Sequence, residues 1–283
     1  KGNFSLKGDE GRVAVDLNAG FFGTEVSVKG AVVAPTSVPA VDLTLSVANN
    51  STANLIKQFA LPLDTPGAPD DGPIAVSLTT RGKIDVLNLK TAIDVGGASF
   101  SIDGKAENLF IDPSYDFKLD LKGDDLKKLV RGLGIDFRPA AANLGGVDLT
   151  LKVSGDHTRA SLNKMKGALG PVKFSGDARI QLTGDRPRVE GTLKTSEVIV
   201  DLFLPADAST AGADAGGAQG RGKSKDRWSK EPFDLAALRD IDGELRFEAP
   251  GVVVGTYDFR SVKAVLALQD GIATVNPFNA RLF

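Results

Sequence analysis

The chain of 283 residues contains no cysteine and only one histidine, His157. Without cysteine it can form no disulfide, no thiolate nucleophile and no Cys-based zinc site, and a lone histidine leaves little for other metal centres. Lysine and arginine number 34 and aspartate and glutamate 36, so no field of one sign marks the whole chain for nucleic acid. We therefore predict no metal site and no nucleic-acid partner.

Catalytic motifs are also missing. His157 lies in the polar segment SGDHTRAS, which favours a surface histidine over a general base, and the chain has no G-x-S-x-G elbow to supply a nucleophile. The carboxylate pairs Asp70-Asp71 and Asp124-Asp125 are typical of turns and helix starts. We predict that the chain is not an enzyme and that it has no catalytic residue and no cofactor.

Long apolar runs are absent as well, because no segment approaches the roughly 20 apolar residues that would span a bilayer. The chain begins KGNFSLKG, without an initiator methionine or a signal segment. We expect it to be a piece of a longer protein, so that any membrane anchor lies outside it.

One stretch does match a known motif. Residues 217–224, GAQGRGKS, fit the phosphate-binding pattern G-x-x-x-x-G-K-[ST]. A phosphate cradle needs a strand that leads directly into a helix. Here a Gly- and Ala-rich stretch after Pro205 precedes the motif, and Pro232 follows too soon for a P-loop helix. We predict no nucleotide binding and interpret residues 206–226 as a flexible insertion, poorly ordered and dispensable for folding.

The sequence does contain an internal repeat, with a period of about 73 residues. The segments TEVSVKG, ASFSIDG and GPVKFSG end at Gly30, Gly104 and Gly176, and these three glycines follow one another at nearly this period. A second set of glycines recurs at almost the same interval, namely Gly8, Gly82 and Gly155.

Within the repeat, hydrophobic residues alternate with polar ones. Residues 41–47 (VDLTLSV), 115–121 (YDFKLDL) and 147–153 (VDLTLKV) each have this period of two, which predicts strands with one apolar and one polar face. Residues 188–194 (RVEGTLK) follow it more loosely.

Turn signals separate the predicted strands. They are Asn18-Ala19-Gly20, residues 94–97 (DVGG) and Asp270-Gly271, the last of which indicates a hairpin between VKAVLALQ and IATV.

Short helices are predicted at the same place after the first two repeat glycines, Gly30 and Gly104. Ser51 and Thr52 are cap candidates for the first helix, and Asp124 and Asp125 occupy the first turn of the second. The third copy, VIVDLFLPAD, has no clear helix.

These patterns predict a mainly β fold: an elongated, antiparallel, repeating sheet curled into a groove, with a short helix about once per repeat. The apolar face of such a sheet must be covered. It can pack into a sandwich, close into a barrel, or form a trough that meets an apolar ligand, and the aliphatic composition suits both a filled core and a trough.

The C-terminal segment carries a family resemblance. It contains Arg227-Trp228-Ser229, then PFDL at residues 232–235, Leu238, an expected turn at Asp242-Gly243 and a closing hairpin from Leu268 to Ile272. In this order the features resemble the C-terminal region of the AsmA family of bacterial envelope proteins. Residues 1–205 resemble the family only in their repeats and alternation.

The resemblance implies a periplasmic protein anchored to the inner membrane by a helix absent from this chain, with a curled β-groove similar to that of bridge-like lipid-transfer proteins. It implies movement of phospholipid or another acyl lipid between inner and outer membranes, and a possible outer-membrane partner. It also implies that Phe233 to Arg239 form a short helix and that Trp228 packs where the insertion rejoins the sheet. The alternative is a non-enzymatic envelope scaffold with a filled apolar core that influences outer-membrane protein assembly.

The patterns and the resemblance divide the chain into three segments: repeating β-groove units at residues 1–205, the flexible insertion at 206–226 and an AsmA-like unit at 227–283. We predict that acyl chains lie against the apolar positions of three of the alternating strands. These are Val41, Leu43, Leu45, Val47, Tyr115, Phe117, Leu119, Leu121, Val147, Leu149, Leu151 and Val153.

Overall fold

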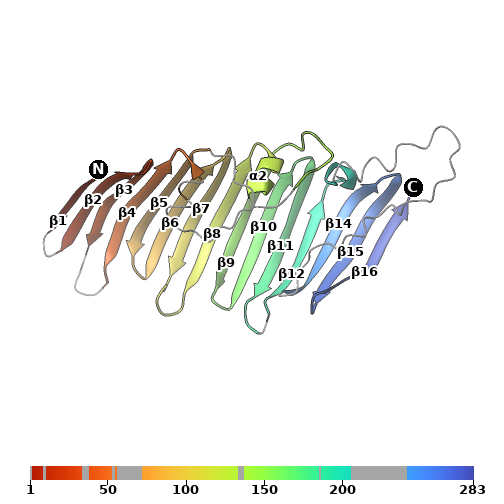
Figure 1. Ribbon diagram of the computed structural model, residues 1–283. Helices are drawn as coiled ribbons and strands as arrows, with labels where there is room; N and C mark the ends of the chain where they lie inside the picture. The colour runs from red at the N-terminus through yellow and green to blue at the C-terminus, as the bar shows by residue number, and fades with distance from the viewer. Residues whose placement is uncertain are drawn as a thin grey trace.

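A computed structural model of the chain describes residues 2–8, 11–33, 38–52, 55, 72–132, 137–184, 186–204 and 241–283. These residues form one long sheet of 16 strands with little helix (Figure 1). The mainly β, mostly antiparallel architecture predicted from the alternation is therefore confirmed.

The first strands are β1 (Gly2–Gly8), β2 (Arg12–Phe21), β3 (Thr24–Val33), β4 (Ala40–Asn49), β5 (Ile74–Lys83), β6 (Val86–Val95), β7 (Ala98–Glu107) and β8 (Ser114–Gly123). After helix α2 (Leu126–Gly132) come β9 (Val147–Asp156), β10 (Arg159–Leu169), β11 (Val172–Gln181), β12 (Arg188–Thr195), β13 (Val198–Ile199), the 3-10 turn η1 (Val200–Leu202), β14 (Asp242–Val254), β15 (Tyr257–Gln269) and β16 (Ile272–Leu282).

The strands follow one another across the sheet in chain order, and consecutive neighbours are antiparallel with one interruption. β14 runs parallel to β12 at its start and parallel to the short β13 at its end. A parallel pair needs a crossover connection, because after β12 the chain must return to the side of the sheet on which β12 begins before β14 can start. β1 and β16 are the two edges, so the sheet is not closed into a barrel.

Strand starts recur at a constant interval. β3, β7 and β11 begin at residues 24, 98 and 172, and β4, β8 and β12 begin at residues 40, 114 and 188. Both series advance by the same number of residues at every step, and this interval is close to the predicted period. Four strands therefore make one period of the described sheet.

The repeat glycines lie where neighbouring strands approach closely. A Cβ added to Gly30 would lie 1.9 Å from the Asp42 carbonyl oxygen, and one added to Gly104 would lie 2.1 Å from that of Asp116. The assignment of Gly176 as the third member was wrong, because β11 begins at residue 172, so the equivalent position is Ala178. The starts of β5 and β9, at residues 74 and 147, are one residue closer together than the starts in the two series above.

Tight turns join several of the strands. Gly96-Gly97 and Asp270-Gly271 have positive φ at both positions, as type I′ hairpins require, and both turns were predicted. The predicted turn at Asn18-Ala19-Gly20 was wrong, because these residues continue β2 and the turn follows at Phe22-Gly23. The expected turn at Asp242-Gly243 was also wrong, since both residues begin β14.

Helix α2 lies over the ends of β8 and β9, midway along the sheet (Figure 1). The Asp125 carboxylate accepts hydrogen bonds from the backbone N–H groups of Lys127 (2.9 Å) and Lys128 (3.2 Å), so Asp125 is the N-cap and neither Asp124 nor Asp125 lies in the first turn. Leu126 packs with Leu144 and Val147 in a small buried cluster. Partly buried neighbours of this cluster are Leu121, Leu129, Val130, Phe137, Ala141, Leu202 and Phe203.

Helical backbone also occurs at the corresponding places of the other periods. Thr52 and Leu55 are helical after β4, and η1 follows β12 in the copy whose sequence shows no clear helix. Thr52, Leu126 at the start of α2 and Val200 at the start of η1 are separated by the same interval as the strand starts.

Candidate functional site

All twelve residues predicted to line an apolar surface lie on one face of the sheet, here called the inner face; the opposite face is the outer face. In β8 and β9 they lie directly opposite one another: Phe117 pairs with Val153, and Leu119 pairs with Leu151. The four residues of β4 are not adjacent to these, because β5, β6 and β7 intervene. The structure therefore brings eight of the twelve together and connects the other four through strands that the prediction omitted.

The connection is a continuous line of directly opposed residues across the sheet, which we call the inner line. It runs from the first strand to the last and contains no charged side chain. Its members are Leu6, Val15, Gly30, Leu43, Thr80, Leu89, Gly104, Phe117, Val153, Leu162, Ala178, Gly191, Leu245, Leu266 and Val275.

The neighbouring line on the outer face has the opposite character, and we call it the outer line. Its ion pair between Arg81 and Asp42 has Nε and Oδ2 3.0 Å apart. The members of the outer line are Lys7, Ala14, Ala31, Asp42, Arg81, Asn88, Lys105, Asp116, Ser154, Ser161, Arg179, Glu190, Glu244, Ala267 and Thr274.

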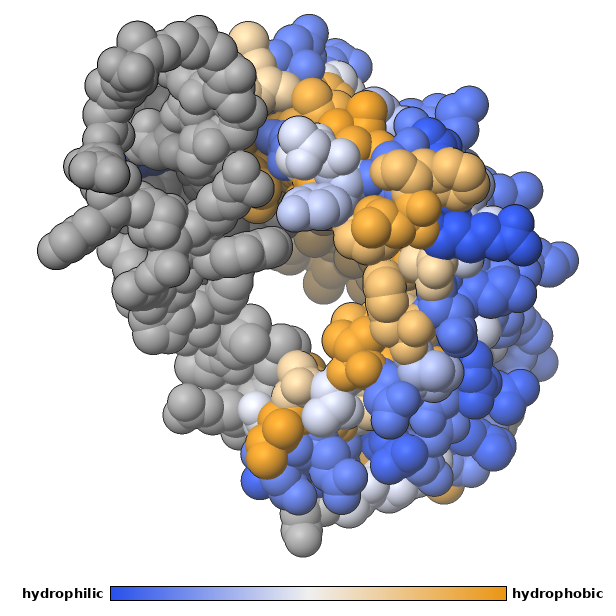
Figure 2. Space-filling view, turned by 90° about the vertical axis from the view of Figure 1, so that its right-hand side faces the viewer, coloured by the Kyte–Doolittle hydropathy of each residue, from blue (hydrophilic) through white to orange (hydrophobic). Residues whose placement is uncertain are grey.

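Figure 2 looks along the sheet from its C-terminal end and shows how the two faces are arranged. Hydrophobic residues, in orange, follow the hollowed side of the described sheet, whereas hydrophilic residues, in blue, cover the outside. The period of two in each strand is thus converted into an apolar concave surface and a polar convex one.

Most of the predicted lining residues are half-buried. Leu43, Leu45, Phe117 and Leu119 all have intermediate exposure, whereas a packed core would bury them almost fully. Val147 is an exception: it is 5% exposed and belongs to the cluster under α2, so the protein itself covers the inner face where β8 ends and β9 begins. Leu151 is also buried, with 8% exposure.

Sequence reasoning missed most of the inner face. The omitted strands carry the same alternation, for example Leu87 and Leu89 in β6 or Phe100 and Ile102 in β7. Ile102 lies directly opposite the predicted lining residue Leu119, so Ile102 lies on the same apolar surface. Extending the period to every strand, instead of three of them, would have found these positions.

A separate hollow of about 750 Å³ lies at the ends of strands between β3 and β8. Its lining includes Glu25, Asp94 and Lys122, together with the Gly96-Gly97 turn. None of the twelve predicted lining residues contributes to it. The hollow is open and has a mixed polar and apolar lining, and it includes Ile74 and Val95, which lie on the inner face at the ends of their strands.

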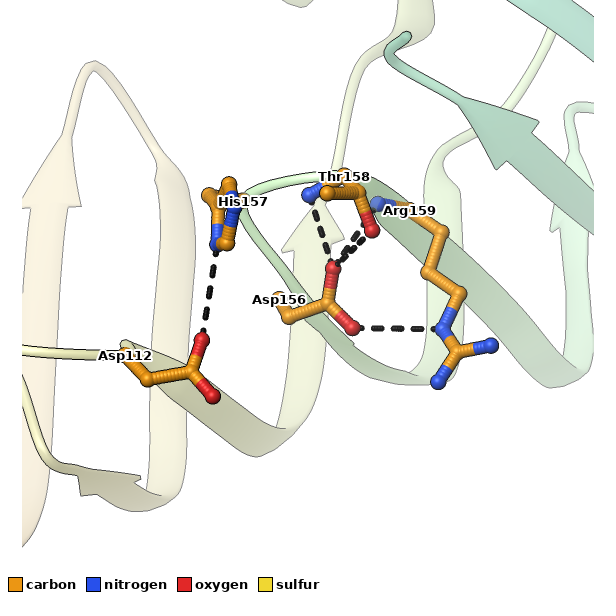
Figure 3. A network of polar contacts seen from close by, with 5 residues as sticks. All are labelled: Asp112, Asp156, His157, Thr158 and Arg159. Atoms are coloured by element: carbon orange, nitrogen blue, oxygen red, sulfur yellow. Dashed lines mark hydrogen bonds and ion pairs between the residues drawn. The ribbon is translucent and has the colours of Figure 1, made fainter.

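His157 lies at the turn between β9 and β10, on the rim of the sheet (Figure 3). Its Nδ1 is 3.6 Å from Asp112 Oδ1, and the two side chains are 64% and 76% exposed. This is the polar surface position that the sequence predicts. An exposed imidazole and an exposed carboxylate at this separation form at most a weak surface pair.

The adjacent Asp156 organises the same turn. Its Oδ1 accepts hydrogen bonds from the Thr158 N–H (2.7 Å), the Thr158 hydroxyl (2.5 Å) and the Arg159 N–H (3.1 Å), as Figure 3 shows. The Thr158 hydroxyl and N–H bonds lower the pKa of Asp156 to about 2, because they favour the ionised carboxylate. The charge has a local structural role in closing the hairpin.

Several predictions concern residues that the structure does not describe. The motif at residues 217–224, the insertion at 206–226, Trp228 and the expected helix from Phe233 to Arg239 all lie outside the described residues. Within the described ranges, no helix is long and apolar enough to cross a membrane. In the same ranges, no three His, Asp or Glu side chains gather to hold a metal ion.

Comparison with known proteins adds no relative: no protein-family model, no curated protein and no solved structure matches the chain.

Proposed function

We propose that the chain binds acyl lipids along the inner face and conducts them across the strands. The observation that carries the proposal is the inner line, which crosses the sheet from Leu6 to Val275 without a charged residue. An apolar surface of this length needs either a second protein layer or an apolar ligand. The half-buried state of Leu43 and Phe117 favours the ligand.

The sheet supports this role through its curvature. A curled sheet holds a chain on several sides while it leaves the polar head group in water. Each CH₂ removed from water contributes about 0.8 kcal/mol, so an acyl chain of ordinary length gains on the order of 10 kcal/mol before ordering costs. Binding therefore needs no polar contact from the protein.

Transport follows from the same surface. Hydrophobic attraction is non-directional, and no position of the inner line carries a charge that would hold a lipid in one place. A lipid that moves from one strand to the next loses and gains comparable contacts, so that the barrier to sliding is low. Selectivity for the head group is expected to be weak, because the inner line carries no charge to recognise it.

We also propose a biological setting: the chain is a periplasmic part of an AsmA-family protein anchored to the bacterial inner membrane, and it carries phospholipid towards the outer membrane. The resemblance in residues 227–283 and the four-strand period of the sheet support this placement. Of the C-terminal features, the hairpin at Asp270-Gly271 has the expected form, whereas Asp242-Gly243 lies in β14 and forms no turn.

The test is lipid occupancy of the purified chain by native mass spectrometry and lipid extraction. We expect bound phospholipid in the natural chain and its loss when Leu45→Glu and Leu119→Glu are combined. Thr44→Glu with Lys118→Glu is the matched control, because both residues lie next to these positions but on the outer face.

Two outcomes would contradict lipid binding. One is a chain without lipid that takes up none from phospholipid vesicles. The other is equal lipid loss in the inner-face and outer-face variants. Either result would favour the scaffold alternative, in which the apolar face is filled by protein.

A further inference from the structure

The two edge strands of the sheet differ in how well they are protected against a further strand. β16 pairs irregularly with β15 at two places, between Arg260 and Lys263 and between Ala264 and Leu266, and it contains Pro277. Bulges and prolines are the devices that block additional pairing at a sheet edge. β1 pairs with β2 at every position from Gly2 to Gly8 without irregularity and contains no proline. Of the two edges of the described sheet, β1 is the regular one, without a bulge or a proline.

β1 also has a feature of two interior strands, β5 and β9. Its Gly8 occupies the position in the four-strand period that Gly82 occupies in β5 and Gly155 in β9. A Cβ added at these glycines would lie 2.9, 2.3 and 2.2 Å from the carbonyl oxygens of the following strands, at Arg12, Val86 and Arg159. β5 and β9 each have a second neighbour on their other side, β4 and β8 respectively. β1 has the same position in the four-strand period but only one neighbour.

The positive charge of Lys7 indicates which kind of strand could pair with β1. Lys7 in β1 occupies the place that Arg81 occupies in β5, one residue before the period glycine. Arg81 forms two hydrogen bonds with Asp42 of β4, from Nε at 3.0 Å and from the terminal nitrogen at 3.2 Å. Among the described residues, none forms an ion pair with Lys7. Asp116 of β8 occupies the place of Asp42.

We propose that the free edge of β1 binds an additional antiparallel polypeptide strand of the type of β4 and β8. The strand alternates apolar and polar residues and places an aspartate opposite Lys7. The pairing of β8 with β9 sets the register: the residue like Tyr115 lies opposite Gly8, and the residue like Phe117 lies opposite Leu6. The inner line and the outer line both continue onto the added strand.

The main-chain hydrogen bonds of β1 supply the affinity in this mode of recognition, and the alternating side chains supply the register. Phe4 and Leu6, which are 66% and 58% exposed, become covered by apolar residues of the incoming strand. A strand shifted by one residue would place its polar side chains on the inner face, so it is excluded.

The test uses the 283-residue chain and a synthetic peptide with the sequence of residues 114–123, SYDFKLDLKG. Hydrogen–deuterium exchange read by mass spectrometry is expected to slow in β1 on peptide addition and to stay unchanged in β16. Fluorescence anisotropy of the labelled peptide gives the affinity. No lipid enters the experiment, so its result is independent of the proposed function.

A charge exchange sharpens the test. Lys7→Glu is expected to weaken peptide binding about fivefold, because a favourable cross-strand pair becomes a like-charge pair. A peptide with Asp116→Lys should restore the affinity for this variant. Lys29→Glu is the matched control, since Lys29 lies on the outer face of the interior strand β3, and it should leave the affinity unchanged.

Three results would overturn the proposal. The first is no change in β1 exchange at saturating peptide. The second is equal affinity for a peptide of the same composition with its alternation shifted by one residue. The third is a dimer of the chain in sedimentation that Lys7→Glu disrupts and the peptide cannot compete away, since a second copy would then occupy the edge.

Discussion

The inner and outer faces of the described sheet differ in charge. Every strand from β2 to β12 contributes to both faces, yet the inner line is uncharged while the outer line carries acids and bases such as Asp42, Arg81 and Lys105. The polar face lies in water and its ion pairs contribute little to stability. The apolar face supplies the packing, so that folding and the proposed lipid binding depend on the same residues.

The sheet is therefore stabilised mainly across neighbouring strands on one side. Described core residues with full burial are few, and the main cluster is the one under α2. Changes on the inner face should affect stability more than equivalent changes on the outer face. Four variants probe this difference, from the largest expected effect to the smallest.

Gly104→Ala should have the largest effect. The new Cβ would lie 2.1 Å from the Asp116 carbonyl oxygen, so β7 and β8 must move apart, at a cost of about 3 kcal/mol. Gly123→Ala is the control, because its Cβ would meet only ordinary contacts at 3.6 Å or more. Thermal unfolding followed by circular dichroism measures both. Equal melting temperatures for the two variants would show that β7 and β8 leave room for a Cβ atom at position 104.

Phe117→Ala should destabilise the chain by about 2 kcal/mol, since the ring is half-buried on the inner face and stacks on Tyr115 with ring centroids 5.9 Å apart. Lys118→Ala, one residue along on the outer face, should change stability by less than about 0.5 kcal/mol. Urea unfolding of both variants measures the difference. A larger loss for Lys118→Ala would reverse the assignment of the faces.

Asp125→Ala should cost about 1 kcal/mol, because it removes the N-cap acceptor for the Lys127 and Lys128 N–H groups. Hydrogen exchange in α2 and in the Val147 cluster is the sensitive measurement, since α2 covers the inner face where β8 ends and β9 begins. Asp124→Ala, an exposed neighbour, is the control. If hydrogen exchange in α2 became equally faster in both variants, Asp125 would not be the specific N-cap of the helix.

The smallest expected effect is on the stability of the fold at low pH, through the carboxylate of Asp156. The folded-state pKa of Asp156 is lowered from 3.8 to about 2, so its ionised form favours the folded chain. This contribution is fully present above about pH 4 and is lost as the pH falls towards 2. Asp156→Asn should remove that part of the acid dependence in melting curves recorded between these values. An unchanged acid profile would mean that the turn does not depend on the charge.

Much of the fold could be predicted from local patterns. The alternation in residues 41–47 and 115–121 identifies strands, and the Asp270-Gly271 pair identifies a hairpin, because both depend on neighbours in the sequence. Errors arose where a local signal was outweighed by pairing. Gly20 and Gly243 suggested turns, but each lies in a strand that has a partner on both sides.

The candidate site was predicted only in part for the same reason. Alternation places Leu43 and Leu119 on an apolar face of their own strands, but it does not say which strands separate them. The parallel pair of β12 and β14 was not anticipated, because nothing in either strand encodes its direction relative to the other. Burial of Val147 depends on Leu126 in α2, which lies far from it in the sequence.

The sequence by itself determined the period, the strands and the separation of apolar from polar faces, since these follow from side-chain alternation within single strands. The tertiary structure alone decided that the apolar faces join into one line from Leu6 to Val275, where α2 covers that face, and which edge is left regular. Register and curvature are set by contacts between strands, and the alternation within a single strand does not specify those contacts.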